Sequence, residues 1–297
     1  MNRIESYKGA LGKQHPIMHV LVGASLATVG LIITGIIGVL ILKLLDNSIE
    51  SMVLLQISSQ IVVFILPALC LSYLVDKNMF SYFDTFDKKN IVKYLIGIVA
   101  VISAAYFIQI MVIDKATFVF PESLKFFESI AKLAQNEHDK FIAQLLTITN
   151  PIMLLIVFVM VAVMPAIGEE LLFRGVLQKG FEQAFKNKWM AIFISGTIFG
   201  IIHFEFYNFF ALCFMGFVLG YIYAITKNIY ITMLLHFINN GTAIVSMYLY
   251  KKNMISMNPE DIVPMYVMLI AGVVLVISLV GLWKYSEQKE IANAPIS

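Results

Sequence analysis

Charged residues are scarce in this 297-residue chain, where Asp, Glu, Lys and Arg together make up 13% and hydrophobic residues 60%. This composition is typical of membrane proteins and not of soluble globular domains. The net charge of +2 is small, and no basic stripe alternates with aromatic residues, which argues against a nucleic-acid partner. Several apolar runs of about 20 residues instead predict a polytopic membrane protein with the lipid bilayer as its surroundings.

Arginine and cysteine are the rarest of the reactive or charged residues. Arg3 and Arg174 are the only arginines, so Arg174, inside an apolar region, marks a position where a planar bidentate donor is used. Cys70 and Cys213 each fall in an apolar run, and we expect small buried hydrophobic residues there, neither a disulfide nor a metal pair. A cleavable signal peptide is not predicted, because the first apolar run is too long for a signal-peptide core.

Eight apolar runs predict an all-α fold, a polytopic membrane helical bundle of about eight transmembrane helices in a single membrane-embedded domain, residues 1–297. The runs cover about residues 17–44, 53–75, 91–113, 151–173, 189–204, 208–226, 229–250 and 264–283. Each approaches the roughly 20 residues that a crossing needs, except the fifth, which is short. An even number of crossings places both termini on one side of the membrane.

The basic residues are distributed unevenly between the two sets of loops. About two thirds of the 21 lysines and arginines lie in the two tails and in alternate loops on the same side. The positive-inside rule therefore predicts that both tails, residues 1–16 and 284–297, are cytoplasmic. The lysine-heavy composition and the lack of eukaryotic targeting signals favour a bacterial cytoplasmic membrane.

The loop from Asp114 to Lys140 carries apolar residues at helical spacing between balanced charges. This pattern predicts an amphipathic helix that lies on the outer surface of the membrane. A substrate gate is the alternative interpretation of the same segment.

The ten residues from Pro165 to Arg174 interrupt an apolar run with two adjacent carboxylates. A charge in hydrocarbon costs roughly 3 kcal/mol on insertion scales, so Glu169 and Glu170 need partners, water or protonation. On a helix Glu170 and Arg174 are about 40° apart, whereas Glu169 and Arg174 are about 140° apart. We therefore expect a Glu170–Arg174 ion pair and a spare carboxylate on Glu169 that is suited to general-base chemistry. The alternative is a helix end with two solvated carboxylates.

Two histidines, His203 and His236, lie in later apolar runs. If the segments on either side of residues 186–188 are helical, they form a hairpin that returns His203 to the depth of Glu169. His203 and His236 reach the same depth only if the turn 203–208 stays inside the protein, where it lines a cavity. Each histidine alone is more often a structural, hydrogen-bonded residue.

Three short motifs together resemble those of the intramembrane proteases related to CAAX-prenyl endopeptidases and to bacteriocin-processing and immunity proteins, the CPBP or Abi family. The motifs are Glu169-Glu170-x-x-x-Arg174, Phe199-x-x-x-His203 and His236-x-x-x-Asn240, in the family's order. The resemblance covers about residues 150–250 and implies that the active site lies there, in the second half of the bundle.

The resemblance implies hydrolysis of a peptide bond in a hydrophobic or membrane-anchored peptide. Glu169 is then the general base, and His203 helps to hold the attacking water. His236 and Asn240 offer donors to the developing oxyanion. Glu170 and Arg174 support Glu169, and Phe199 holds the imidazole of His203.

Three further interpretations remain open from the sequence. Glu169, His203 and His236 also form a donor set for a hydrolytic Zn²⁺ ion, although no two histidines stand at i and i+4, and water activated by Glu169 without a metal is preferred. A secondary transporter also carries polar residues in the membrane, but it predicts inverted repeats that the first four runs lack. A non-catalytic immunity or binding membrane protein is the third interpretation.

Overall fold

The structure is a computed structural model that describes residues 7–44, 48–77, 82–83, 91–114, 117–259 and 261–292. Within this part of the chain the fold is all helical and has no strands. The elements are α1 (Pro16–Leu44), α2 (Ile49–Ser59), η2 (Gln60–Ile65), α3 (Leu66–Asp76), α4 (Ile91–Phe107), η3 (Ile108–Met111), η4 (Glu122–Leu124), α5 (Lys125–Leu145), α6 (Pro151–Phe158), η5 (Val159–Val163), α7 (Met164–Glu170), η6 (Leu171–Gln178), α8 (Lys179–Phe185), α9 (Lys188–Ile202), α10 (Phe209–Thr226), α11 (Ile229–Lys251) and α12 (Met265–Ala292).

Seven helical segments of the described chain are long and apolar enough to cross a membrane. They are Pro16–Ile41, Ile49–Asp76, Ile91–Met111, Pro151–Phe185, Phe209–Thr226, Ile229–Lys251 and Met265–Gln288. The fifth apolar run forms α9, which has 15 residues and is too short to count among them. The expected eight helices are thus seven long spans and one short helix, and the chain is a multi-pass membrane protein.

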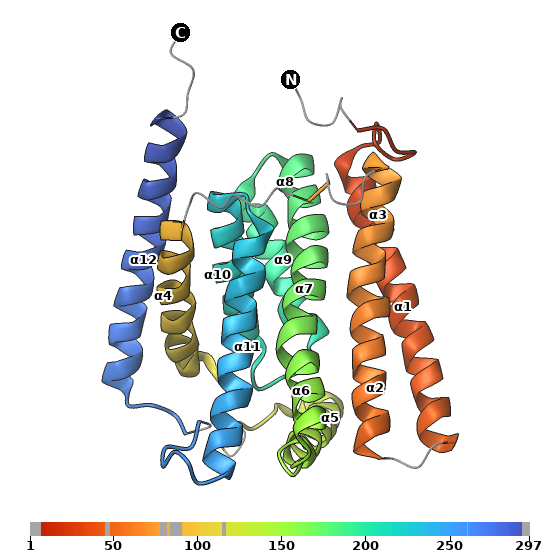
Figure 1. Cartoon of the computed structure of the whole chain (residues 1–297), viewed down its shortest axis with the longest axis vertical. Coiled ribbons are helices and arrows are strands. Elements are labelled where there is room, and N and C mark those ends of the chain that lie inside the picture. The colour runs from red at the N-terminus through yellow and green to blue at the C-terminus, as the bar shows by residue number, and fades with distance from the viewer. Residues whose placement is uncertain are drawn as a thin grey trace.

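The spans form a bundle in which α1 with α2 and α3 lies at one side and α4 with α12 at the other, with α6 to α11 between them (Figure 1). The beginning of α1 and the end of α12 lie at the same end of the bundle (Figure 1). Most of the expected C-terminal tail, 284–297, continues α12 as far as Ala292, and residues 1–6 and 293–297 lie outside the described residues.

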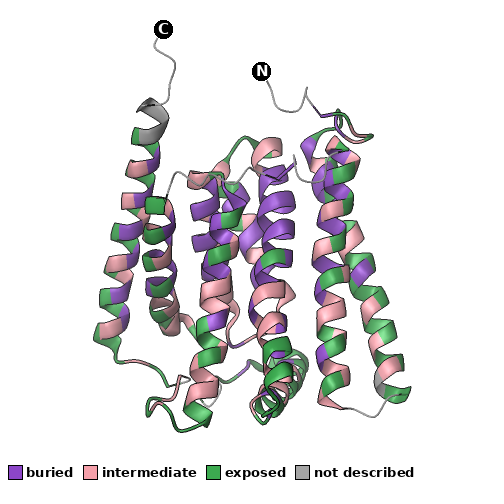
Figure 2. Cartoon of the chain, viewed as in Figure 1, coloured by how far each residue is buried: buried purple, intermediate pink, exposed green. Residues whose placement is uncertain are grey.

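The outer helices expose large apolar side chains, whereas buried residues gather in the central helices (Figure 2). On α12 these exposed residues include Leu269, Ile270, Val273, Val276 and Ile277. A surface of this kind suits contact with lipid. The same exposure corrects one expectation, because Cys70 lies on the exposed surface of α3 while Cys213 is buried; both are free thiols. The apolar sequence around Cys70 does not imply burial, because a membrane helix also has apolar residues on the face that contacts lipid. Cys70 lies on the exposed face of α3.

Two internal prolines stand just after π-helical turns. Pro67 follows η2, and Pro165 follows η5, each at the first or second position of the next α-helical segment. Proline has no N–H and its ring clashes with the preceding turn, so a wider turn before it relieves the crowding. The long helix Pro151–Phe185 stays continuous but changes register twice, at η5 and again at η6 directly after Glu170.

Two Lys-Asn turns connect the central helices. Lys186 and Lys227 each adopt the left-handed conformation that ends α8 and α10, and Asn187 and Asn228 cap α9 and α11 with their side chains. The Lys227 Nζ lies 2.6 Å from an oxygen of Glu182, which is within α8 and not in the α8–α9 turn. The α10–α11 turn therefore packs beside α8.

Small residues bring α9 and α10 into close contact. A Cβ atom on Gly216 would lie 2.9 Å from Cα of Gly196, and one on Gly200 would lie 2.4 Å from Sγ of Cys213. Small residues spaced four apart allow membrane helices to approach closely. This contact fixes α9, and with it His203, against the bundle.

The predicted amphipathic segment forms α5, which lies at the end of the bundle away from the beginning of α1 (Figure 1). Most of its residues are exposed, but Ala131 and Leu145 are buried. Beyond α9, the turn 203–208 is tied to neighbouring segments, since the N–H of Ile113 donates to the carbonyl of Tyr207 and His138 lies 3.8 Å from Glu205. His203, Phe204 and Glu205 line a cavity and Tyr207 is buried, but Phe204 is 69% exposed, so a turn that lies wholly inside the protein stays a prediction.

Candidate active site

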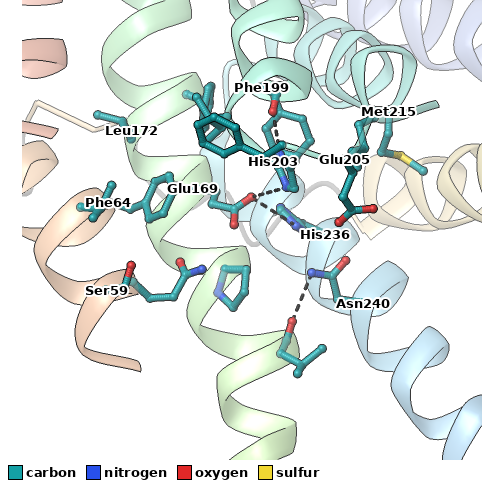
Figure 3. A pocket seen from close by; sticks show the side chains of 18 of the residues that line it. Ser59, Phe64, Glu169, Leu172, Phe199, His203, Glu205, Met215, His236 and Asn240 are labelled. Carbon is teal, nitrogen blue, oxygen red and sulfur yellow. Dashed lines mark hydrogen bonds and ion pairs between the residues drawn. The ribbon is translucent and has the colours of Figure 1, made fainter. Parts of the chain in front are cut away.

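A cavity of about 830 Å³ opens between the α1–η2 side of the bundle and the central helices. Its lining includes Glu169, Phe199, His203, His236 and Asn240 (Figure 3). Residues of α5 close one end of it, and apolar side chains make up most of the remaining wall. Burying an ionisable group in such surroundings costs free energy unless the group has a partner, and an ionisable residue kept there often has a function.

Glu169 stands at the centre of the polar group in this cavity. Its side chain is only 7% exposed, and its Oε2 atom has no hydrogen-bond partner within the described residues. Oε2 lies 3.8 Å from Nε2 of His203 and 3.9 Å from Nε2 of His236 (Figure 3). One carboxylate oxygen therefore faces two imidazole nitrogens, at distances beyond that of a direct hydrogen bond.

His203 caps the end of α9 and is held there by Phe199. Its Nδ1 lies 2.6 Å from the backbone carbonyl oxygen of Phe199, and the two ring centroids are 4.5 Å apart. A carbonyl only accepts, so Nδ1 carries the hydrogen, and Nε2 of the neutral ring is left as an acceptor. Phe199 thus fixes both the orientation and the tautomer of the imidazole that faces Glu169.

His236 is held by the other carboxylate of the pair. Its Nδ1 lies 3.1 Å from Oε1 of Glu170, and Oε2 of Glu170 lies 3.2 Å from Nε of Arg174. Glu170 and Arg174 are completely buried, and the guanidinium lies 5.4 Å from the ring centroid of Phe199. The expected ion pair of Glu170 and Arg174 is present, and it orients His236 as well as balancing charge.

The hydrogen-bonding needs of this group are not met by its own atoms. With Nδ1–H of each histidine directed away, Nε2 of neutral His203, Nε2 of neutral His236 and Oε2 of Glu169 are three acceptors that face one another. Like acceptors repel, so this arrangement requires hydrogen from a water molecule or a proton on one of the three groups. His236 lies between two carboxylates, with Nδ1 3.1 Å from Glu170 and Nε2 3.9 Å from Glu169.

The same three side chains are the ones a metal would need, since Glu and two His are typical ligands of hydrolytic zinc. With Zn–ligand bonds near 2.1 Å, tetrahedral ligand atoms are about 3.4 Å apart. Both measured distances from Glu169 are longer, at 3.8 and 3.9 Å, and within the described residues no group of three His, Cys, Asp or Glu side chains has the spacing of a metal site. The donor types fit zinc, but their arrangement does not.

Asn240 lies one turn after His236, and its amide is engaged elsewhere. Its Nδ2 donates to the carbonyl of Val161 at 3.2 Å (Figure 3), and its Oδ1 accepts from Asn239 at 3.1 Å. In an α-helix the N–H of residue 165 would pair with the carbonyl of Val161, but Pro165 has no N–H. Asn240 therefore donates to a carbonyl that cannot have its α-helical partner, while it also lines the cavity.

Sequence patterns did not single out the opposite wall of the cavity. Gln56, Ser59 and Gln60 line it from α2 and η2, and the Glu205–His138 pair lines it from the α9–α10 turn and α5. The two glutamines and the serine carry no charge and therefore attract little notice. Their i, i+3, i+4 spacing in an apolar helix nevertheless places them on one face, and this polar face could be recognised from the sequence. The pairing of Glu205 with His138 depends on tertiary structure and has no local signal.

Comparison with protein-family models gives one match over the region that contains this site. Residues 151–242 match the family described as Type II CAAX prenyl endopeptidase Rce1-like. The matched segment includes Glu169, His203, His236 and Asn240. The comparisons with curated proteins and with solved structures gave no match.

Proposed function

We propose that this chain, which over residues 151–242 belongs to the Rce1-like type II CAAX prenyl endopeptidase family, is an intramembrane endopeptidase that hydrolyses a peptide bond in a membrane-associated peptide or protein. Its catalytic core would comprise residues 150–250. The observation that carries the proposal is the approach of Glu169 Oε2 to both imidazoles, at 3.8 and 3.9 Å, in a cavity that is otherwise mostly apolar.

The general base in this proposal is Glu169. A water molecule between Glu169 and His203 donates one hydrogen to Oε2 and the other to Nε2 of neutral His203. As the water oxygen bonds to the peptide carbonyl carbon, its proton passes to Glu169. The C–N bond then breaks, and the protonated Glu169 returns that proton to the leaving nitrogen, so that one carboxyl group serves both steps.

The charge that develops on the carbonyl oxygen needs a donor. His236 as an imidazolium offers Nε2–H on the cavity side while Nδ1–H stays on Glu170 at 3.1 Å. Asn240 is the second candidate donor, through the amide hydrogen that does not bond Val161. Removing one such donor typically costs about 3 kcal/mol of transition-state stabilisation.

The partners of Glu170 act by positioning. Arg174 neutralises the buried Glu170 carboxylate, and this carboxylate holds the imidazole of His236. Phe199 does the same for His203 through its backbone carbonyl. A catalytic group whose orientation is fixed in advance does not have to lose that freedom during the reaction.

The decisive experiment replaces Glu169 by Gln in detergent-solubilised protein and follows cleavage of a fluorogenic apolar peptide. We expect the substitution to keep the fold and to remove cleavage, because the amide cannot accept the proton of water. Glu182→Gln is the matched control on the same long helix, since Glu182 pairs with Lys227 outside the cavity. Undiminished cleavage by Glu169→Gln would reject the assignment, and an intact cellular role without cleavage would favour a binding protein.

A further inference from the structure

A polar stripe lies on the cavity wall opposite the catalytic helices. Gln56, Ser59 and Gln60 stand at i, i+3 and i+4, so they share one face of the α2–η2 helix, and all three line the cavity. They belong to the span Ile49–Asp76, which is long and apolar enough to cross a membrane. Figure 3 shows Ser59 on the side of the cavity that faces Glu169.

Gln60 is the buried member of this stripe. The residue is 6% exposed, and its Oε1 atom has no hydrogen-bond partner within the described residues. A buried amide oxygen without a partner is unfavourable in a folded protein. Gln60 therefore belongs to the cavity wall and carries a buried acceptor that no hydrogen bond within the described residues satisfies, so a turn of its side chain would offer that oxygen to a chain in the cavity.

Close packing of two helices places Gln60 beside the segment that carries Glu169. A Cβ atom on Gly168 would lie 3.5 Å from the backbone oxygen of Gln60 and 3.0 Å from Cβ of Phe64. Gly168 directly precedes Glu169, so the backbone of Gln60 lies against the turn of helix that carries Glu169. A chain that lies in the cavity against Glu169 therefore passes Gln60.

We propose that Gln60 is a substrate-binding residue whose side-chain amide accepts a hydrogen bond from a backbone N–H of the peptide next to the bond that is cut. This inference rests on the proposed function, since it assumes a peptide in the cavity. A backbone N–H is present in every peptide, so Gln60 holds the chain in register without selecting its side chains. An extended peptide also offers a carbonyl to the amide hydrogens of Gln60, as pairs of amides do.

Binding is measured without hydrolysis, in the Glu169→Gln background, with a fluorescein-labelled ten-residue peptide of Ala, Leu and Val in detergent. Replacing Gln60 by Leu in that background removes one neutral hydrogen bond, and we expect affinity to fall about tenfold. The thermal midpoint should stay the same or rise, because an unpartnered buried oxygen is removed. Gln183→Leu is the matched control: its Oε1 is also buried and unpartnered, but Gln183 lies in α8 and does not line the cavity.

A series of peptides with single ester replacements identifies the contact. An ester lacks the N–H, so one position should lose affinity in the protein with Gln60 and lose none in the Gln60→Leu variant. Equal affinity of the two proteins for the parent peptide, or the same ester sensitivity in both, would overturn the inference. A fall in thermal midpoint with unchanged ester sensitivity would instead assign Gln60 a structural role.

The outcome separates this inference from the proposed function. In the protein with Glu169, the Gln60→Leu substitution should raise KM about tenfold and leave kcat within about twofold. Cleavage that depends on Glu169 but not on Gln60 would reject only the inference. Ester-sensitive binding through Gln60 without any cleavage would reject the endopeptidase and keep the peptide site.

Discussion

Nδ1 of His236 lies 3.1 Å from Oε1 of Glu170. The histidine that faces Glu169 is therefore oriented by Glu170, the residue that follows Glu169 in the sequence. Successive residues of a helix point in different directions, and here Glu169 points into the cavity while Glu170 points to Arg174. Under the proposed function the two adjacent glutamates would have separate tasks: Glu169 would take part in the chemistry, and Glu170 would position the imidazole of His236 beside it.

The Glu170–Arg174 ion pair can be tested by removing one partner and then both. Arg174→Met leaves a buried carboxylate uncompensated, and we expect the free energy of unfolding to fall by about 3–5 kcal/mol. The double variant Glu170→Gln/Arg174→Met should recover most of that stability but little activity, since His236 loses its carboxylate partner. Thermal unfolding and initial rates check the two expectations. Full activity in the double variant would contradict the positioning role.

Arg174→Lys tests geometry without loss of charge. The lysine ammonium can neutralise Glu170, but it lacks the planar guanidinium that lies beside Phe173 and Phe199. We expect activity to be reduced and not abolished, with a smaller loss of stability than in Arg174→Met. A rate equal to that of the parent protein would mean that only charge is needed at this position.

His203 and Phe199 should differ in how much each contributes to the reaction. His203→Ala removes the imidazole that receives a hydrogen from water, and we expect a loss of at least about 100-fold in kcat. Phe199→Leu keeps the backbone carbonyl that His203 bonds and removes only the ring, so the loss should be less than about tenfold. The comparison uses kcat at saturating peptide. Equal losses would show that the ring, and not the carbonyl, controls the imidazole.

Asn240 and Pro165 are expected to be coupled in stability. Asn240→Leu leaves the carbonyl of Val161 without its donor and should cost about 1–3 kcal/mol. Pro165→Ala supplies an N–H that can take over this carbonyl, so it should offset part of that cost in the double variant. If Asn240 also serves the oxyanion, kcat of the double variant stays low while stability returns. Additive losses of stability would contradict the coupling.

Chelation addresses the metal alternative directly. The distances of 3.8 and 3.9 Å around Glu169 Oε2 suit a shared water better than a zinc ion. We expect purified protein to keep its activity after 1,10-phenanthroline treatment and to contain much less than one zinc per chain. Inactivation that added Zn²⁺ reverses would require the three side chains to close around a metal.

Helical periodicity was enough to predict the Glu170–Arg174 pair, because that contact is local and depends only on residues four apart. The meeting of His203 with Glu169 also followed from simple lengths, since the two helical arms on either side of residues 186–188 are nearly equal. Both contacts could be predicted because the number of residues between the partners, together with helical geometry, determines how far apart they lie. The roles of Glu169, His203, His236 and Asn240 stay predictions until the variants are measured.

Other parts of the site depend on tertiary structure. A proline in an apolar run does not say whether the preceding turn becomes π-helical, as it does before Pro67 and Pro165. The bond from Asn240 to Val161 joins helices far apart in sequence and follows from that proline only when the packing is known. Gln60 was overlooked because it is uncharged, and its significance comes from the cavity that it faces.

The short length of α9 also has a geometric consequence. Fifteen residues rise about 22 Å, whereas the hydrocarbon layer is roughly 30 Å thick, so a helix of this length that began at one membrane surface would end, at His203, before it reached the other. A peptide anchored in the bilayer would then be cut at a set distance from its point of entry, whatever residues happen to be there. The length of α9 would then determine which peptide bond is cut, and lengthening α9 by one turn would move the point of cleavage along the substrate.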